Sequence, residues 1–230
     1  MIHLYGSPDP PIPRLAAALG ARGHRLVAEG GRAPGESSTL VLGAGGGLDP
    51  MALGVLLGGW RKTPRARALV ISALGAHPDA RAPRLRELWE LEEAVRTAKI
   101  PSLVLRLAPL AGPDAPFWRR LRSRPRLGAH AQALVQPVAE SDVLDTLDRA
   151  LHGQVAWEEW YELAGPDVFT MAELAGLAAA SGSPLRPGEG EWEPPLAEIA
   201  EHRVAETGPW SRHFGITPRP LAGEVSAWAG

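Results

Sequence analysis

The chain has 230 residues, a formal net charge of −2 and no cysteine. The lack of cysteine excludes disulfides, thiolate metal sites and cysteine nucleophiles, and the small net charge gives no electrostatic reason to expect nucleic acid as a partner. Apolar residues make up 45% of the chain, enough for a buried core, and no apolar run is long enough to span a membrane, so we expect a cytoplasmic protein that binds neither nucleic acid nor membranes.

Amide and basic residues have an unusual distribution. Asparagine is absent, and all but two of the 24 basic residues are arginine. Few thermolabile amides and many guanidinium groups are typical of proteins that work at high temperature. We therefore expect a thermophilic source with a GC-rich genome, although codon bias alone also accounts for the arginine excess.

Short apolar runs alternate with helical patterns through the first half of the chain. Strands are expected at 1–5, 25–29, 40–42, 68–73 and 102–107, and helices at 14–21, 48–60 and 83–98. The residues 30–39 are rich in glycine, serine and proline and are expected to form a loop. Continuous apolar strands that alternate with helices indicate a parallel sheet with helices on both faces, so the predicted fold class is α/β.

The alternation changes after Pro109. Here we expect a helix at 116–122, a strand at 133–138, a helix at 141–151, a strand at 160–164, a helix at 169–181 and a loop at 182–195. Thr170 precedes Glu173 by three residues, the pattern of a capping box. We predict an α/β domain over 1–110 and a smaller α+β portion over 111–230, interleaved with it and packed on it as one structural unit.

Several short sequence words follow one another in a defined order. They are LVISALGA at 69–76, Leu105-Arg106 with Pro109, Gly112-Pro113 before Pro116-Phe117-Trp118, QPV at 136–138 before Asp142-Val143, YELAGP at 161–166 and FGITPRP at 214–220. Over about residues 1–221 the chain resembles the atypical branch of the short-chain dehydrogenase/reductase family, the NmrA-like and complex I accessory-subunit-like members. The resemblance implies a Rossmann-type sheet, a small C-terminal substrate portion and often a bound NAD(P).

The family's phosphate-binding turn is altered in this chain. The pattern Gly-x-x-Gly-x-x-Gly falls on Gly6, Asp9 and Ile12, so two of the three glycines are missing. Asp9 places a carboxylate where phosphate charge belongs, and four prolines between 8 and 13 remove backbone N–H donors. We therefore expect that the protein carries no dinucleotide.

The adenine side of the family's cofactor site is expected to be truncated. The family has a further helix and strand after its second strand, whereas only residues 30–39 fill that interval here. Ten extended residues span roughly 33 Å, too little chain for both elements. Glu29 ends the second strand at the spacing of an acidic ribose-binding residue, which favours NAD over NADP, or it is a solvated carboxylate at a strand end.

The family's hydride-transfer residues are also replaced. The resemblance implies a tyrosine acid or base and a lysine four residues later, and these positions fall on Arg84 and Leu88. Arginine stays protonated and leucine carries no proton, so the usual dehydrogenase chemistry is not expected. The family's active-site serine aligns with Ser72 or with Ala73. No catalytic residue is assigned, and no metal site, because Glu198 and His202 are read as a surface pair.

A ligand, if one binds, is expected outside the C-terminal ends of the strands. The candidate binding residues are Gly6, Ser7, Glu29, Gly43, Gly45, Ser72 and Leu107. Two functions remain open. The first is a non-catalytic pseudoenzyme that acts as a ligand sensor, scaffold or assembly protein. The alternative is an NAD(P)-dependent reductase or isomerase with a non-standard site that uses Glu29, Gly43–Gly47, Ser72 and the 107–113 loop.

Self-association is expected because a truncated sheet leaves an apolar face with less cover, and a homodimer is the commonest way to cover such a face. The helix at 83–98 offers a second candidate surface through Leu85, Leu88, Trp89 and Glu92. A turn at 7–13 or the loop at 182–195 that folds over the gap within one chain is the alternative to the dimer.

Overall fold

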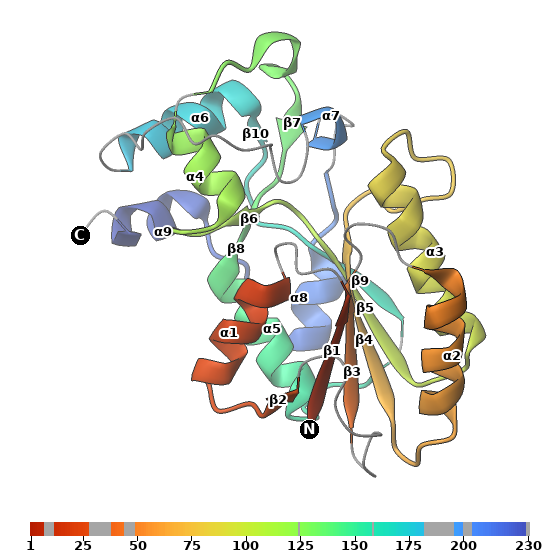
Figure 1. The fold of residues 1–230 in the computed structure, drawn as a ribbon. Helices are drawn as coiled ribbons and strands as arrows, with labels where there is room; N and C mark the ends of the chain where they lie inside the picture. The colour runs from red at the N-terminus through yellow and green to blue at the C-terminus, as the bar shows by residue number, and fades with distance from the viewer. Residues whose placement is uncertain are drawn as a thin grey trace. The chain divides into compact units, whose positions relative to one another are not determined.

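The computed structural model describes residues 1–6, 12–27, 38–43, 49–123, 125–157, 159–181, 196–199 and 204–228. The chain divides into two compact units, and each is drawn in Figure 1. Unit 1 comprises Met1–Arg106 and Asp148–Tyr161, and unit 2 comprises Leu107–Leu147 and Glu162–Gly230. Each unit therefore takes two separate stretches of the chain.

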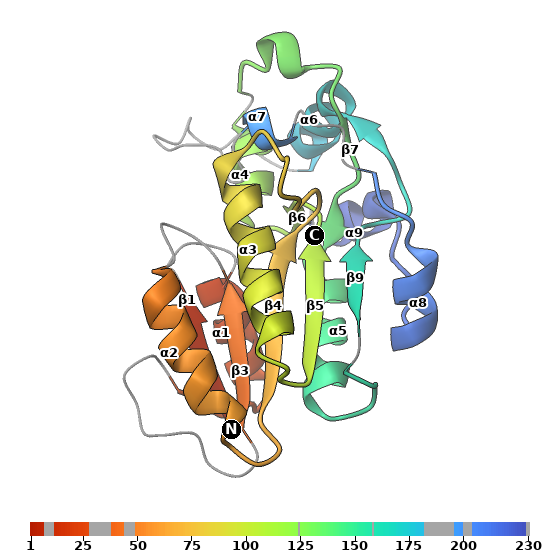
Figure 2. The same ribbon diagram turned by 90° about the vertical axis from the view of Figure 1, so that its right-hand side faces the viewer.

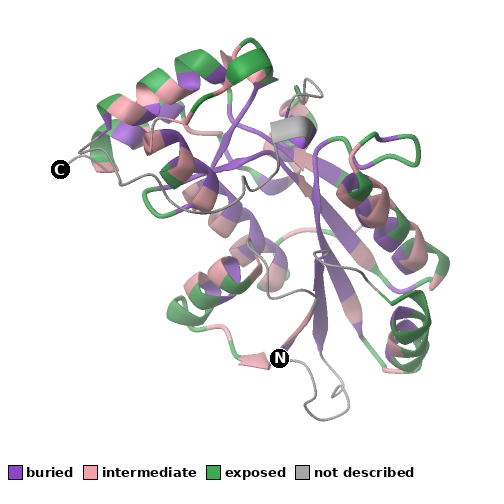
Figure 3. Ribbon diagram, turned by 45° about the horizontal axis from the view of Figure 1, so that its top comes forward, coloured by how far each residue is buried: buried purple, intermediate pink, exposed green. Residues whose placement is uncertain are grey.

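A six-stranded parallel sheet runs through unit 1, with the strand order β2-β1-β3-β4-β5-β9. The strands are β1 (Ile2–Gly6), β2 (Leu26–Val27), β3 (Thr39–Gly43), β4 (Arg67–Ala73), β5 (Ser102–Leu107) and β9 (Trp160–Leu163). All residues of β3 and all but the first of β4 are buried, as Figure 3 shows along the sheet. Continuous burial of this kind is what a parallel sheet covered on both faces requires.

Helices cover both faces of this sheet (Figure 2). On one face lie α2 (Pro50–Arg61) and α3 (Pro83–Thr97), and on the other lies α1 (Ile12–Ala21). Alternate residues of the strands point to the α2 and α3 side, where they form one apolar cluster with the helices. Its strand members are Leu40, Leu42, Ala68, Val70 and Val104, and its helix members include Leu53, Leu57, Trp60, Leu91 and Val95.

The predicted α/β fold class is confirmed, with small shifts at the helix starts. α1 begins at Ile12, two residues before the predicted start, and Pro13 lies in its first turn, where a missing N–H costs no helical hydrogen bond. α2 begins at Pro50, because the Asp49 side chain caps it by accepting a hydrogen bond from the Met51 N–H at 3.0 Å. In the described part of the chain the sheet ends at β2, and most of the predicted 30–39 loop lies outside the described residues.

Unit 2 is built from short elements. They are β6 (Leu110–Ala111), α4 (Pro116–Arg122), the 3-10 helix η1 (Gly128–His130), β7 (Leu134–Val135), β8 (Val138–Ala139), most of α5 (Glu140–Leu151), β10 (Phe169–Thr170), α6 (Met171–Ala180), α7 (Leu196–Ile199), α8 (Gly208–Phe214) and α9 (Leu221–Trp228). Two small sheets pair β7 with β10 and β6 with β8. None of the described helices is both long and apolar enough to cross a membrane.

The predicted capping box is present at the start of α6. The Thr170 hydroxyl accepts a hydrogen bond from the Glu173 N–H at 3.2 Å, and the Glu173 carboxylate accepts one from the Thr170 N–H at 2.7 Å. Both residues therefore satisfy backbone or side-chain groups that the first helical turn leaves open.

The single strand predicted at 133–138 is wrong. The segment forms β7 and β8, which belong to different two-stranded sheets. Pro137 lies between them and has no N–H to donate, so a continuous ladder is broken there. The buried Gln136 side chain makes other contacts instead, because its amide donates to the Gly165 carbonyl and accepts from the Ala205 N–H, both at 2.7 Å.

Candidate functional site

The C-terminal ends of β1, β3 and β4 bring the predicted site residues of unit 1 together. Gly6 lies opposite Gly43, and Gly43 lies opposite Ile71, which directly precedes Ser72. This is the edge of a parallel sheet where ligands bind in related architectures. Ser7, Glu29 and Gly45 lie outside the described residues, and Leu107 is a buried residue of unit 2.

The space beside Gly43 is filled by an apolar side chain. A β-carbon placed on Gly43 would lie 2.6 Å from both Cγ1 and Cδ1 of Ile12, the first residue of α1. Real β-carbons do not approach other atoms so closely, so the glycine is needed to admit Ile12. The Gly43 backbone is therefore covered by the Ile12 side chain.

The Ser72 hydroxyl is bound within unit 1. Ser72 follows Ala68 and Val70 on the face of β4 that meets α3, and it is buried. Its Oγ donates a hydrogen bond to Oε1 of Glu92 at 2.5 Å. A hydroxyl that donates to a buried carboxylate is fixed in orientation, because the carboxylate loses free energy if the bond is broken without a replacement.

Glu92 also receives the charge of Arg106. The Arg106 Nε lies 3.0 Å from Oε1, and its Nη2 lies 2.6 Å from Oε2, which is a forked ion pair between α3 and β5. The guanidinium in turn lies 4.4 Å from the ring centroid of Trp160 in β9. The network therefore connects three strands and one helix of unit 1.

No sequence pattern indicated this network, and one of its residues was assigned to a different role. Leu85, Leu88 and Glu92 were expected to form an association surface on α3, but all three are buried. Their spacing places them on one face of α3, and that face packs against the sheet. A carboxylate at an inward position of an apolar stripe is the signal that would have identified Glu92 as a buried partner for Ser72 and Arg106.

The positions that the family resemblance assigns to proton transfer do not fit that chemistry. Leu88 packs with Ala73, Ala76 and Ala80 in a second apolar cluster, and Arg84 lies one turn before it on α3. In the described residues, Ile12 covers Gly43 and Ser72 is bonded to Glu92. Arg84 and Leu88 therefore do not supply the tyrosine and lysine that the family resemblance implies at these positions.

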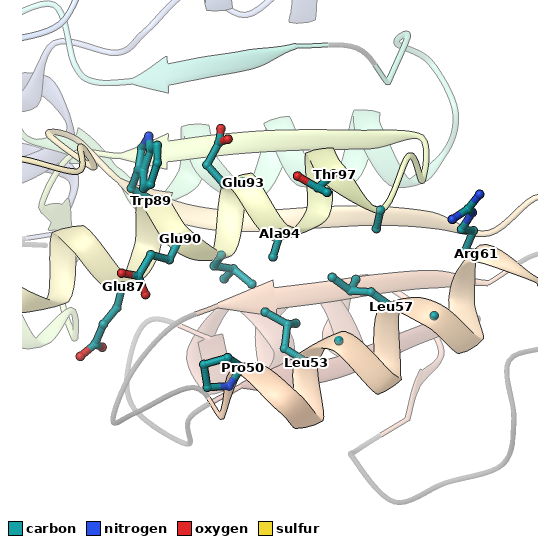
Figure 4. Close-up of a pocket in the computed structure, with 14 residues that line it drawn as sticks. Pro50, Leu53, Leu57, Arg61, Glu87, Trp89, Glu90, Glu93, Ala94 and Thr97 are labelled. Carbon is teal, nitrogen blue, oxygen red and sulfur yellow. The ribbon is translucent and has the colours of Figure 1, made fainter.

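An open groove lies between α2 and α3, with a volume of about 580 Å³ (Figure 4). Leu53, Leu57 and Ala94 line it, and Pro50 lies at the same end as Glu87 while Arg61 lies at the other end. The outer side of α2 next to the groove exposes Met51 and Val55, at 78% and 74%. The sequence did not predict the groove. Apolar residues and glycines occur on all sides of α2, so their spacing does not show which residues face outward.

Comparisons with known proteins identify the fold. No family model and no curated protein matches the sequence. Among solved structures, WbmG from Bordetella bronchiseptica in complex with NAD and UDP has a TM-score of 0.64 and 12% identity, over 99% of this chain and 94% of that chain. MoeE5 in complex with UDP-glucose and NAD has a TM-score of 0.71 and 15% identity, over 99% of this chain and 97% of that chain.

A third similar structure is a mutant of UDP-glucuronic acid 4-epimerase from Bacillus cereus, in complex with UDP-4-deoxy-4-fluoro-glucuronic acid and NAD. It has a TM-score of 0.65 and 15% identity, over 100% of this chain and 98% of that chain. At these identities the likeness concerns the fold. The predicted α/β fold of the Rossmann type is thus confirmed.

Proposed function

We propose that the protein is a non-catalytic Rossmann-fold protein that acts as a homodimeric scaffold or assembly protein. The observation that carries the proposal is the contact of Ile12 with Gly43. In a dinucleotide site the backbone after the first strand approaches the pyrophosphate, which lies at the N-terminus of the following helix. Here the first residue of that helix places a branched apolar side chain over the neighbouring strand end.

The Ser72 network supports the same proposal. A serine that serves a reaction must present its hydroxyl to a reacting atom. The Ser72 hydroxyl instead donates to Glu92, whose two oxygens also accept from Arg106. A side chain held in this way stabilises the sheet and its helix, and Leu88 adds to the same packing.

The surface of α2 supports the homodimer. Residues 50–60 carry no charge, and Gly54 and Gly58 have no atom within 4 Å of a built β-carbon, so a second helix has room to approach closely. Large exposed apolar surfaces usually mark interfaces, and twofold symmetry is the commonest arrangement. When two copies of α2 pack antiparallel, Arg61 of one copy meets the Glu87 end of the groove of the second copy, and the charges are complementary.

Titration with NAD, NADH, NADP and NADPH tests the non-catalytic proposal. The expected result is an unchanged melting temperature at millimolar dinucleotide. A ligand at one hundred times its dissociation constant would stabilise the protein by nearly 3 kcal/mol, an easily measured shift. Saturable binding of any of the four dinucleotides would contradict the proposal and favour the alternative, a reductase or isomerase with a non-standard site.

A further inference from the structure

Two imidazoles flank one carboxylate in unit 1, remote in sequence from the strand ends of the candidate site. His24, Asp148 and His152 each offer one ligand atom, and these atoms lie within 4.8 Å of one another. We propose that they form a binding site for a divalent transition-metal ion of the zinc type, with three protein ligands and an open coordination position. The proposal is independent of the proposed scaffold function.

The three ligands come from two segments of the chain. His24 lies in the turn between α1 and β2, whereas Asp148 lies in the last turn of α5 and His152 follows directly after that helix. The spacing of four residues places Asp148 and His152 on one side of the helix end. His24 and Asp148 are 124 positions apart in the sequence, which explains why no sequence motif indicates the site.

The distances are close to those of a metal centre. His24 Nε2 lies 2.7 Å from Oδ1 of Asp148, and His152 Nδ1 lies 3.5 Å from the same oxygen. The two imidazole rings lie side by side, with centroids 4.8 Å apart. Metal–ligand bonds of about 2.0–2.1 Å in a tetrahedron place ligand atoms roughly 3.3 Å apart, so the widest pair must close by about 1.5 Å.

The side chain that has to move, His152, is the most exposed of the three. The exposed fraction is 10% for the His24 side chain, 34% for Asp148 and 54% for His152. His24 and Asp148 therefore form the ordered part of the site, and His152 closes on the ion from the solvent side. In the structure the His152 Nδ1 lies 2.9 Å from the Asp148 carbonyl oxygen, and on metal binding the ring proton moves to Nε2.

The ligand set selects the class of ion. Imidazole nitrogens suit zinc, cobalt and nickel, whereas magnesium and calcium prefer sites made of oxygen atoms alone. Two histidines and one carboxylate leave at least one position for water or an added anion. A bound ion would fasten the turn that precedes the edge strand β2 to the end of α5, and so add a cross-link between distant parts of unit 1.

The test uses the full chain without a histidine tag. Cobalt(II) is added to metal-free protein while visible absorption is recorded, and zinc is then added to displace it. The variants are His24→Gln, which keeps an N–H donor for Asp148, and His152→Gln at the exposed ligand. His77→Gln is the matched control. His77 also lies near a carboxylate, 3.8 Å from Asp79, but among the described residues it belongs to no group of three possible metal ligands.

The expected result is one equivalent of cobalt with the intense visible bands of a low-coordinate site, displaced by zinc, and a melting temperature that rises with zinc concentration. Both ligand variants should bind at least about tenfold more weakly, since even indirect changes around metal ligands cost 10–100-fold, while His77→Gln binds as the wild type does. Absence of cobalt bands, or bands that both ligand variants retain, would overturn the proposal. Circular dichroism of each variant establishes that a loss of binding does not come from unfolding.

Discussion

Arg106 grips both carboxylate oxygens of Glu92, in a pair that is largely removed from solvent. Charge-assisted forked pairs are strong hydrogen bonds. Removing one partner is strongly destabilising, because the charge of the other is left in a poorly solvated position. The pair also orients the Ser72 hydroxyl. Ser72, one of the two positions that align with the active-site serine of the family, thus belongs to a hydrogen-bond network inside unit 1.

Replacing Arg106 by leucine should lower the free energy of unfolding by about 3 kcal/mol, since it leaves the Glu92 charge buried without its partner. The double variant with Glu92→Leu as well should be clearly more stable than Arg106→Leu alone, because no charge remains. Ser72→Ala removes one hydrogen bond and should cost about 1 kcal/mol. Urea denaturation measures all three, and equal stability of the single and double leucine variants would contradict the network.

Gly43→Ala should destabilise unit 1 by about 1–3 kcal/mol through overpacking against Ile12. Adding Ile12→Ala should recover part of the loss, so the two substitutions will not be additive. Gly176→Ala is the control, since a β-carbon there meets open space at an exposed position of α6, and a gain of about 0.5–1 kcal/mol is expected. Strict additivity at Gly43 and Ile12 would show that they are not in contact.

Thr170→Ala should cost about 1 kcal/mol through loss of the α6 cap, whereas Thr170→Ser should be nearly neutral. The Thr170 N–H and hydroxyl hold the pKa of Glu173 below its usual range. A depressed pKa in the folded state stabilises the fold above the ordinary glutamate range, and that contribution is lost as the pH falls. The stability difference between the wild type and Glu173→Gln should therefore be present at pH 7 and shrink in acid, as thermal denaturation across pH will measure.

Light scattering at micromolar concentration should give about twice the chain mass of 24.4 kDa. Val55→Glu, on the uncharged side of α2, should shift the equilibrium to monomer because it places a charge in the interface. Val204→Glu is a matched control at a valine that is 53% exposed in unit 2. A wild-type monomer at every accessible concentration, or a dimer that Val55→Glu leaves intact, would contradict the α2 interface.

The parallel sheet was predictable from sequence because its strands are short, continuous apolar runs, and β4 and β5 could be located to within one residue. The capping box at Thr170 was predictable for a different reason, since its signal is local. The pairing of β7 and β8 with separate partners was not, because it depends on where Gln136 finds distant backbone groups.

The candidate site was only partly predictable. Gly6 and Gly43 come together because parallel strands in register end at one edge. The contact of Ile12 with Gly43 was not predictable, since the sequence of a turn does not show which neighbouring strand its side chains pack against. The roles of Glu92 and Arg106 depend on the approach of a helix to two strands, which periodicity alone does not determine.

Because each unit takes two separate stretches of the chain, neither can fold completely until late in synthesis. Unit 1 is complete only when Tyr161 has been synthesised, and residues 107–147 of unit 2 are synthesised before that point. Until then the first 106 residues lack the contact between the Arg106 guanidinium and the Trp160 ring, and part of unit 2 has already been made. No single cut of the chain releases either unit whole, so fragments made for separate study need a permuted or joined chain.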